Sequence, residues 1–238
     1  MILKKNQNLK IATILPYKEN YSKDKASAAS LWVAEFYKKS KFKKNNYIFG
    51  HTISKNFLTK NYKNIKLDTL KSKFRSTTNE YIKKLKKLIC DNYDIVEIHN
   101  RPLILFELIK NINSRFIFYF HNDPLSMKGS KTVKERLKIL QSVVKIIFVS
   151  EWVRERFFLN MDKKLQAKTE VVYPSVNKQK KIKKRKNIVF VGRLNYSKGY
   201  DVFKEAIIKI LDEFPSWKAY SLGDEDRRNI YIKHEKHK

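Results

Sequence analysis

Apolar positions along the chain follow two alternating patterns, which predict a succession of strands and helices. Short continuous apolar runs, such as IVFV at 188–191, are typical of strands covered on both faces. Between them lie segments whose apolar residues recur every three or four positions, as in the amphipathic stretch 79–90. The predicted strands are 10–15, 47–50, 94–99, 116–120, 145–149, 170–173, 188–191 and 217–222, and the predicted helices are 26–39, 79–90, 102–110, 132–141, 151–158 and 198–211.

The order of these elements predicts an α/β protein, because strands alternating with helices favour a parallel sheet with helices on both faces. The segment 178–186, KQKKIKKRK, interrupts the alternation with a block of like charges, which is typical of a solvated linker. We therefore expect an N-terminal Rossmann-like domain over 1–176, a basic linker over 177–186 and part of a second domain over 187–238. The second unit is too short to cover both faces of a sheet by itself.

Composition narrows the class of protein. The chain has 238 residues, of which 42% are hydrophobic, enough for a substantial core. The single cysteine, Cys90, excludes a disulfide framework and fits a reducing compartment. No apolar run approaches the ~18 residues of a membrane span. The apolar stretch 11–15 is too short for a signal peptide, so we expect a cytoplasmic protein.

The formal net charge of +30 leaves three interpretations open. Lysines spread over the whole chain favour a general bias in composition, because a dedicated site would gather them on one face. Attraction to the inner face of an anionic membrane is the second interpretation, and binding of nucleic acid is the third. No zinc-finger spacing or other nucleic-acid module is present, so we expect no specific nucleic-acid partner.

Two histidines stand at the ends of predicted strands, where ligands of open parallel sheets collect. His99 follows DIVEI and His121 follows FIFYF. A hydrogen-bonded structural role remains the alternative for both. Ser150 follows another strand, and capping of the next helix is the simpler interpretation for it. No third ligand has a recognisable spacing to the histidines, so no metal site is predicted.

A basic turn joins the strand at 188–191 to the last predicted helix. It carries Arg193 and Lys198 close to a helix start, where unpaired N–H groups and the helix dipole favour a phosphate. A basic turn without a ligand is the alternative.

This strand, turn and helix resemble the start of the C-terminal domain in family 4 retaining glycosyltransferases of the GT-B fold. That family reads strand, G-R-L, a few residues, K-G, helix, and the matching residues here are Gly192, Arg193, Leu194, Lys198 and Gly199. The resemblance implies that Arg193 and Lys198, with the two glycines, bind the diphosphate of a nucleotide-sugar donor.

The N-terminal half resembles the same family at several strand ends. The segment HNDP, which begins with His121 and Asn122, resembles the strand-end catalytic histidine that lies beside the transferred sugar. His99 resembles the ending of the preceding strand, and Ser150 belongs to a V-S-x-x-x-R phrase. Ser27 begins the small segment Ser-Ala-Ala that replaces the family's Gly-Gly pair. The resemblance implies acceptor or sugar contacts from Ser27, His99, Asn122 and Ser150. Pro-Ser at 174–175 departs from the family's N-G pair.

The resemblance implies a hexosyltransferase that moves a sugar from a nucleotide-diphosphate sugar to an envelope saccharide or glycolipid acceptor. It implies no cofactor besides the donor substrate. No counterpart of the family's late Glu-containing motif follows SLGD at 221–224, so we expect an incomplete GT-B protein, truncated in the donor domain, either as a fragment or as a naturally short version. The alternatives are a non-catalytic basic module that binds anionic membranes or nucleic acid, and an inactive gene fragment.

Overall fold

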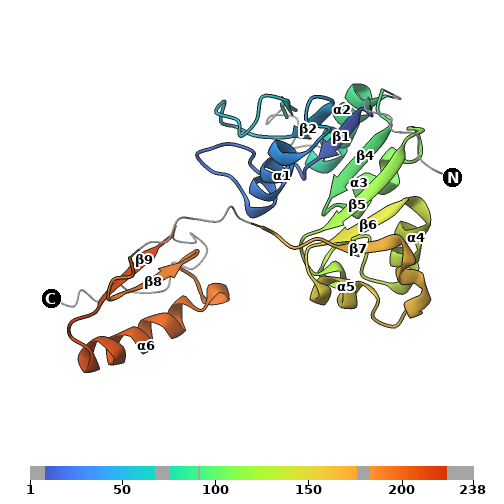
Figure 1. The fold of residues 1–238 in the computed structure, drawn as a ribbon. Helices are drawn as coiled ribbons and strands as arrows, with labels where there is room; N and C mark the ends of the chain where they lie inside the picture. Colours follow the sequence, from blue (N-terminus) through green and yellow to red (C-terminus); the bar gives the residue numbers. More distant parts are fainter. Residues whose placement is uncertain (1–8, 68–75, 91, 176–182, 224–238) are drawn as a thin grey trace. The chain divides into compact units, whose positions relative to one another are not determined.

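The computed structural model describes residues 9–67, 76–90, 92–175 and 183–223. The chain divides into two compact units, Met1–Val176 and Asn177–Lys238, and each is described by itself (Figure 1).

The first unit is built on a seven-stranded sheet in which every neighbouring pair of strands is parallel. The strand order is β3-β2-β1-β4-β5-β6-β7, and Figure 1 labels all of these strands except β3. The strands are β1 Ile11–Ile14, β2 Asn46–Gly50, β3 Tyr62–Asn64, β4 Ile95–His99, β5 Arg115–Phe120, β6 Lys145–Phe148 and β7 Thr169–Val171. The predicted α/β class with a Rossmann-like parallel sheet is therefore confirmed. The edge strand β3 was not predicted, because three residues of YKN are too short and too polar to show a pattern.

In the part of the first unit that the structure describes, five α-helices connect these strands, and their starts follow local sequence signals. They are α1 Ala28–Lys39, α2 Thr77–Ile89, α3 Pro102–Leu108, α4 Val133–Ser142 and α5 Glu151–Phe157. Thr132 and Glu135 form a reciprocal capping box at α4, which satisfies two N–H groups that a helix start leaves unpaired. Pro102 occupies the first turn of α3, where its missing N–H removes no helical hydrogen bond.

The two faces of the sheet are covered unequally. Helices α2 to α5 pack with alternate strand residues into one large core, in which the rings of Phe120, Phe148 and Phe157 lie 5.2–5.6 Å apart between centroids. A smaller core between α1 and β1–β3 contains Leu15 and Val33. Because side chains alternate along a strand, Glu97 and His99 of β4 point away from the large core and toward α1.

The second unit contains a parallel pair of strands, β8 Asn187–Val191 and β9 Lys218–Leu222, and the helix α6 Tyr200–Glu213. Phe190 packs on Tyr200 and Phe203 of α6, at 5.1 and 5.2 Å between ring centroids. The expectation that β8 is covered on both faces is wrong for the described residues. Val189 and Val191 remain 45% and 77% exposed, because α6 covers the opposite face.

None of the helices in the described ranges is long and apolar enough to span a membrane.

Candidate functional site

The structure brings the two predicted histidines into direct contact. His99 ends β4 and His121 follows β5, and these two strands are parallel neighbours. Nδ1 of His99 lies 2.7 Å from Nε2 of His121, and the two rings stack 5.0 Å apart. The backbone N–H of His121 also donates to Oδ1 of Asn100 at 2.7 Å. Asn100 is buried and adopts a left-handed φ of 54°, and its bond to the backbone of His121 helps to fix the spacing of the pair.

Burial keeps both histidines neutral near pH 7. It lowers the pKa of His121 to about 4. It lowers the pKa of His99 well below the ordinary value, with a further contribution from the neighbouring His121. Each neutral ring has one N–H donor and one acceptor nitrogen, so a single hydrogen holds the pair together. The pair can therefore polarise a hydroxyl group by hydrogen bonding without adding a positive charge to the site.

A second polar group lies beside the histidines on the same face of the sheet, and the sequence reasoning missed it. Oγ1 of Thr13 lies 2.6 Å from Oε2 of Glu97 and 3.0 Å from Oδ1 of Asn46, and the Tyr119 hydroxyl donates to Oε1 of Glu97 at 3.1 Å. Burial raises the pKa of Glu97, while its two hydrogen bonds act in the opposite direction. The sequence did hold a signal for Glu97. Side chains two positions apart lie on the same face of a strand, so Glu97 shares its face with His99.

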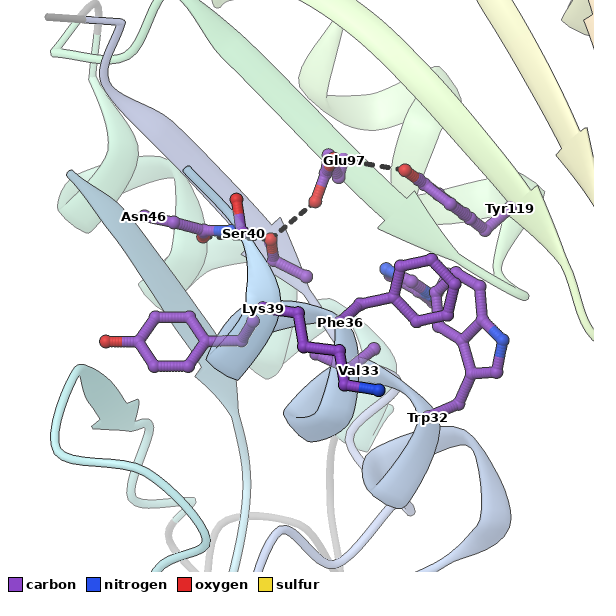
Figure 2. Close-up of a pocket in the computed structure, with 11 residues that line it drawn as sticks. Trp32, Val33, Phe36, Lys39, Ser40, Asn46, Glu97 and Tyr119 are labelled. Carbon is purple, nitrogen blue, oxygen red and sulfur yellow. Dashed lines mark hydrogen bonds between the residues drawn. The ribbon is translucent and has the colours of Figure 1, made fainter. Parts of the chain in front are cut away.

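A pocket of about 270 Å³ lies between α1 and these strand residues (Figure 2). Its sheet side carries Thr13, Asn46, Glu97, His99 and Tyr119, and its helix side carries the aromatic side chains of Trp32, Phe36 and Tyr37. Trp32 and Phe36 stack at 4.0 Å, and the edge of Trp32 meets the His121 ring at 5.1 Å between centroids. The histidine pair thus adjoins a pocket with one polar and one aromatic side.

Two of the predicted contact residues serve as helix caps. The Ser27 hydroxyl accepts from the backbone N–H of Ser30 at 3.2 Å, and the Ser150 hydroxyl accepts from that of Val153 at 3.3 Å. The capping interpretation given above for Ser150 is thus supported, and Ser27 has the same role at α1. Asn122 is exposed one residue beyond His121.

The second unit places its four predicted residues in the connection between β8 and α6. Gly192 follows β8, and a methyl group added to it would lie 3.9 Å from Cγ of Lys198. Arg193 and Lys198 are both exposed. Lys198 ends a 3-10 turn, Tyr196–Lys198, and the helix begins only at Tyr200, slightly later than predicted. Gly199 between them has a φ of 71°, which favours glycine.

The sequence reasoning missed two further residues of this connection. Asn195 is buried, and its carbonyl oxygen accepts from the backbone N–H groups of Lys198 and Tyr200 at 3.1 and 3.3 Å. These bonds hold the turn closed ahead of the helix. Asp201 lies in the first turn of α6, where its carboxylate stabilises the helix but opposes a bound anion at the same end.

Among the residues that the structure describes, no group of three or more His, Cys, Asp or Glu side chains is placed to hold a metal ion. The expected absence of a metal and of a cofactor stays a prediction.

Comparison with known proteins gives one curated relative and a fold match. No family model matches the chain. Over 173 residues the chain is 25% identical to the putative glycosyltransferase YtcC of Bacillus subtilis (strain 168). The aligned stretch covers 62% of this chain and 42% of that protein. The structure is similar to that of the trehalose-6-phosphate synthase OtsA, with a TM-score of 0.64, 15% identity, and coverage of 92% of this chain and 66% of the other.

An apo structure of OtsA matches with a TM-score of 0.55 and 15% identity, over 90% of this chain and 64% of that one. The chain thus spans less than half of the curated relative and about two thirds of the solved chains. At these identities the solved structures show the fold alone, and they agree with the Rossmann-like sheet described above.

Proposed function

We propose that this chain is part of a glycosyltransferase that transfers a sugar from a nucleotide-diphosphate sugar to a saccharide or glycolipid acceptor. The observation that carries the proposal is the contact between His99 and His121 at adjoining strand ends. The similarity to the putative glycosyltransferase YtcC and to the fold of OtsA supports it. The family 4 resemblance adds retention of configuration and a hexosyl donor to the proposal.

In this proposal His121 is the catalytic residue and acts on a sugar hydroxyl close to the anomeric carbon. Its Nε2 faces His99, so its Nδ1 is the nitrogen left for the substrate. The ring is neutral near pH 7 and is held by His99, while Asn100 holds the backbone N–H of His121. A fixed neutral donor or acceptor needs no reorientation as the transition state forms, which is the basis of electrostatic preorganisation.

Arg193 and Lys198 are proposed to stabilise the diphosphate as it leaves. Both are exposed cations on the connection that precedes α6, whose N-terminal dipole has the same sign. Removing one preorganised donor from a developing anion typically costs about 3–4 kcal/mol in the barrier. In this proposal the two cations supply the charge that stabilises the leaving diphosphate, so it needs neither metal nor cofactor.

The proposed setting is assembly of an envelope polysaccharide, lipopolysaccharide or glycolipid at the inner face of a membrane. The net charge of +30 supports this setting, because each basic residue near an anionic leaflet contributes about 1 kcal/mol of attraction.

The test is calorimetric titration of the protein with a panel of nucleotide-diphosphate sugars, followed by a transfer assay with the donor that binds. We expect Arg193→Ala and Lys198→Ala each to weaken donor binding and to reduce transfer by about 100-fold or more. The matched control is Lys204→Ala, an exposed lysine on α6. His121→Ala should abolish transfer while donor binding persists.

Equal donor binding by the control and by both cation variants would refute the phosphate contact. Binding to anionic vesicles or oligonucleotides that depends on salt, with no donor binding at all, would instead establish the basic binding module.

A further inference from the structure

The acidic residues are distributed unevenly along the chain, although the lysines occur throughout it. The segment 36–67 contains nine lysines and no Asp or Glu. In the structure this segment spans the end of α1, the turn after it, and the strands β2 and β3. These two strands form one edge of the seven-stranded sheet. A lysine-rich segment without acidic residues therefore occupies one border of the first unit.

The fold brings lysines from two parts of this segment together. Lys43 lies in the turn between α1 and β2, and Lys60 lies shortly before β3. The side-chain amide of Asn61 donates to the carbonyl oxygens of Lys43 and Asn46, at 3.0 and 3.1 Å. The backbone N–H of Lys43 donates to the carbonyl oxygen of Ser40 at 3.3 Å. These bonds hold the two lysine-bearing stretches side by side on ordered backbone.

Both stretches line a lysine groove, a hollow of about 480 Å³ on the surface of the first unit. It is lined by Lys38, Lys43, Lys44 and Lys60, together with Tyr37 and Leu58. Lys38 pairs with Glu35 at 2.7 Å. Among the residues that the structure describes, the other three lysines pair with no carboxylate. The groove thus presents several cations that the protein itself leaves without a counter-charge.

Two other hollows of the first unit are basic but contain an acidic side chain. The hollow along α2 contains three lysines and Glu107, which accepts from Lys86 at 3.3 Å. The hollow beside the start of β4 contains Lys10 and Asp94. A cleft lined by charges of one sign concentrates its field and attracts ions of the opposite sign. Of these three hollows, the lysine groove is the one built in this way.

We infer that the lysine groove binds a ligand with two or more phosphate groups close together. Lysine binds phosphate as a point charge, whereas arginine is the usual partner where a carboxylate is held by two parallel hydrogen bonds. The described lining of the groove contains lysines and no arginine. A phosphate monoester carries about −1.5 to −2 charges at neutral pH, so four lysines match two such groups. Tyr37 and Leu58 offer apolar contacts to the organic part of the ligand.

Two sources share this chemistry, a soluble phosphate compound and the headgroup of a phosphate-bearing lipid. The inference goes beyond the proposed function and does not depend on it. The groove lies in the first unit, whereas the proposed diphosphate contacts, Arg193 and Lys198, lie in the second.

The experiment is calorimetric titration of the whole chain carrying Arg193→Ala and Lys198→Ala, so that the second unit does not contribute. The soluble probes are pyrophosphate and inositol hexakisphosphate, with citrate as the carboxylate control and a single-stranded oligonucleotide as the polymer control. Co-sedimentation with phosphatidylcholine vesicles, with and without a fifth of cardiolipin, tests the lipid source. We expect a phosphate probe to bind at low salt with a dissociation constant on the order of 100 μM, and citrate to bind at least about tenfold more weakly.

Two matched double variants, made in the same background, locate the binding. Lys43→Gln with Lys60→Gln removes one cation from each stretch of the groove. Lys83→Gln with Lys87→Gln removes two lysines from the hollow along α2 and changes the net charge equally. All four side chains are exposed, so both variants should melt as the background does. We expect the groove variant to weaken the phosphate probe about tenfold or more, and the α2 variant to change it less than about twofold.

Binding to cardiolipin vesicles identifies a lipid headgroup as the source, binding of the soluble probes identifies a free phosphate compound, and either result supports the inference. It is overturned if no phosphate probe binds up to about 10 mM, or if the groove variant binds as the background does. Equal losses in the two double variants would also overturn it, because net charge would then be the cause. Citrate binding as tightly as pyrophosphate, or the oligonucleotide binding most tightly of all, would overturn it as well.

Discussion

The histidine pair should make the stability of the first unit fall steeply in mild acid. Burial lowers the pKa of His121 from 6.5 to about 4, whereas an unfolded chain restores the ordinary value. Between these two values the unfolded state binds more protons than the folded state, so stability decreases as the pH falls. The contribution of His121 is fully present above pH 6.5 and is lost as the pH falls from there to about 4.

The size of the effect follows from the two pKa values. Each unit of difference corresponds to about 1.4 kcal/mol, so His121 alone should remove about 2 kcal/mol by pH 5 and about 3 kcal/mol by pH 4. His99 acts in the same direction, because its pKa is also lowered. Glu97 acts in the opposite direction, because its pKa is raised and acid relieves the cost of its buried charge.

The assay is urea denaturation between pH 8 and pH 4.5, followed by circular dichroism and by tryptophan fluorescence. Trp32 reports on the pair directly, since its ring edge contacts His121. The perturbation is His121→Gln, which cannot titrate, and the control is His51→Gln in the loop after β2. The pH dependence of the free energy of unfolding should be shallower in the His121 variant by about 2 kcal/mol at pH 5, and unchanged in the control.

A wild-type protein whose stability stays constant from pH 7 to pH 5 would refute the reasoning. A His121→Gln variant that keeps the full wild-type slope would refute it as well, because the slope would then come from other groups.

Four other substitutions test the packing and the connection before α6. Phe148→Ala removes a fully buried ring from the large core and should cost about 3–5 kcal/mol of unfolding free energy in denaturant titration, and a loss below 1 kcal/mol would contradict the described packing. Thr132→Ala removes the α4 cap and should cost about 1 kcal/mol by the same measurement. Asp201→Asn removes a negative charge from the start of α6 and should strengthen nucleoside-diphosphate binding about two- to fivefold in calorimetry, whereas weaker binding would argue against an anion site there. Gly223→Ala would push a methyl group into the carbonyl oxygen of Gly192, so its melt should show a disrupted β8–β9 pair, and an unchanged melt would contradict that close approach.

Much of the first unit could be predicted from local pattern. Strand and helix periods identified six of the seven strands and all five helices, because each burial pattern repeats within a few residues. Position at a strand end also singled out His99 and His121. The prediction failed for β3, which has only three residues, and for the burial of β8. An apolar run shows that a strand tends to be covered, but it does not say which element covers it.

The sequence by itself determined which segments form strands and helices and which side chains share a face of a strand. Only the tertiary structure decided which strands become neighbours. The order of the strands brings His99 into contact with His121 and places Glu97 between Thr13 and Tyr119. In the folded unit Trp32 also packs against the histidine pair. The physical reason is that a side chain's direction depends on its own backbone, whereas its hydrogen-bond partners, its burial and its pKa depend on segments that the crossover connections bring beside it.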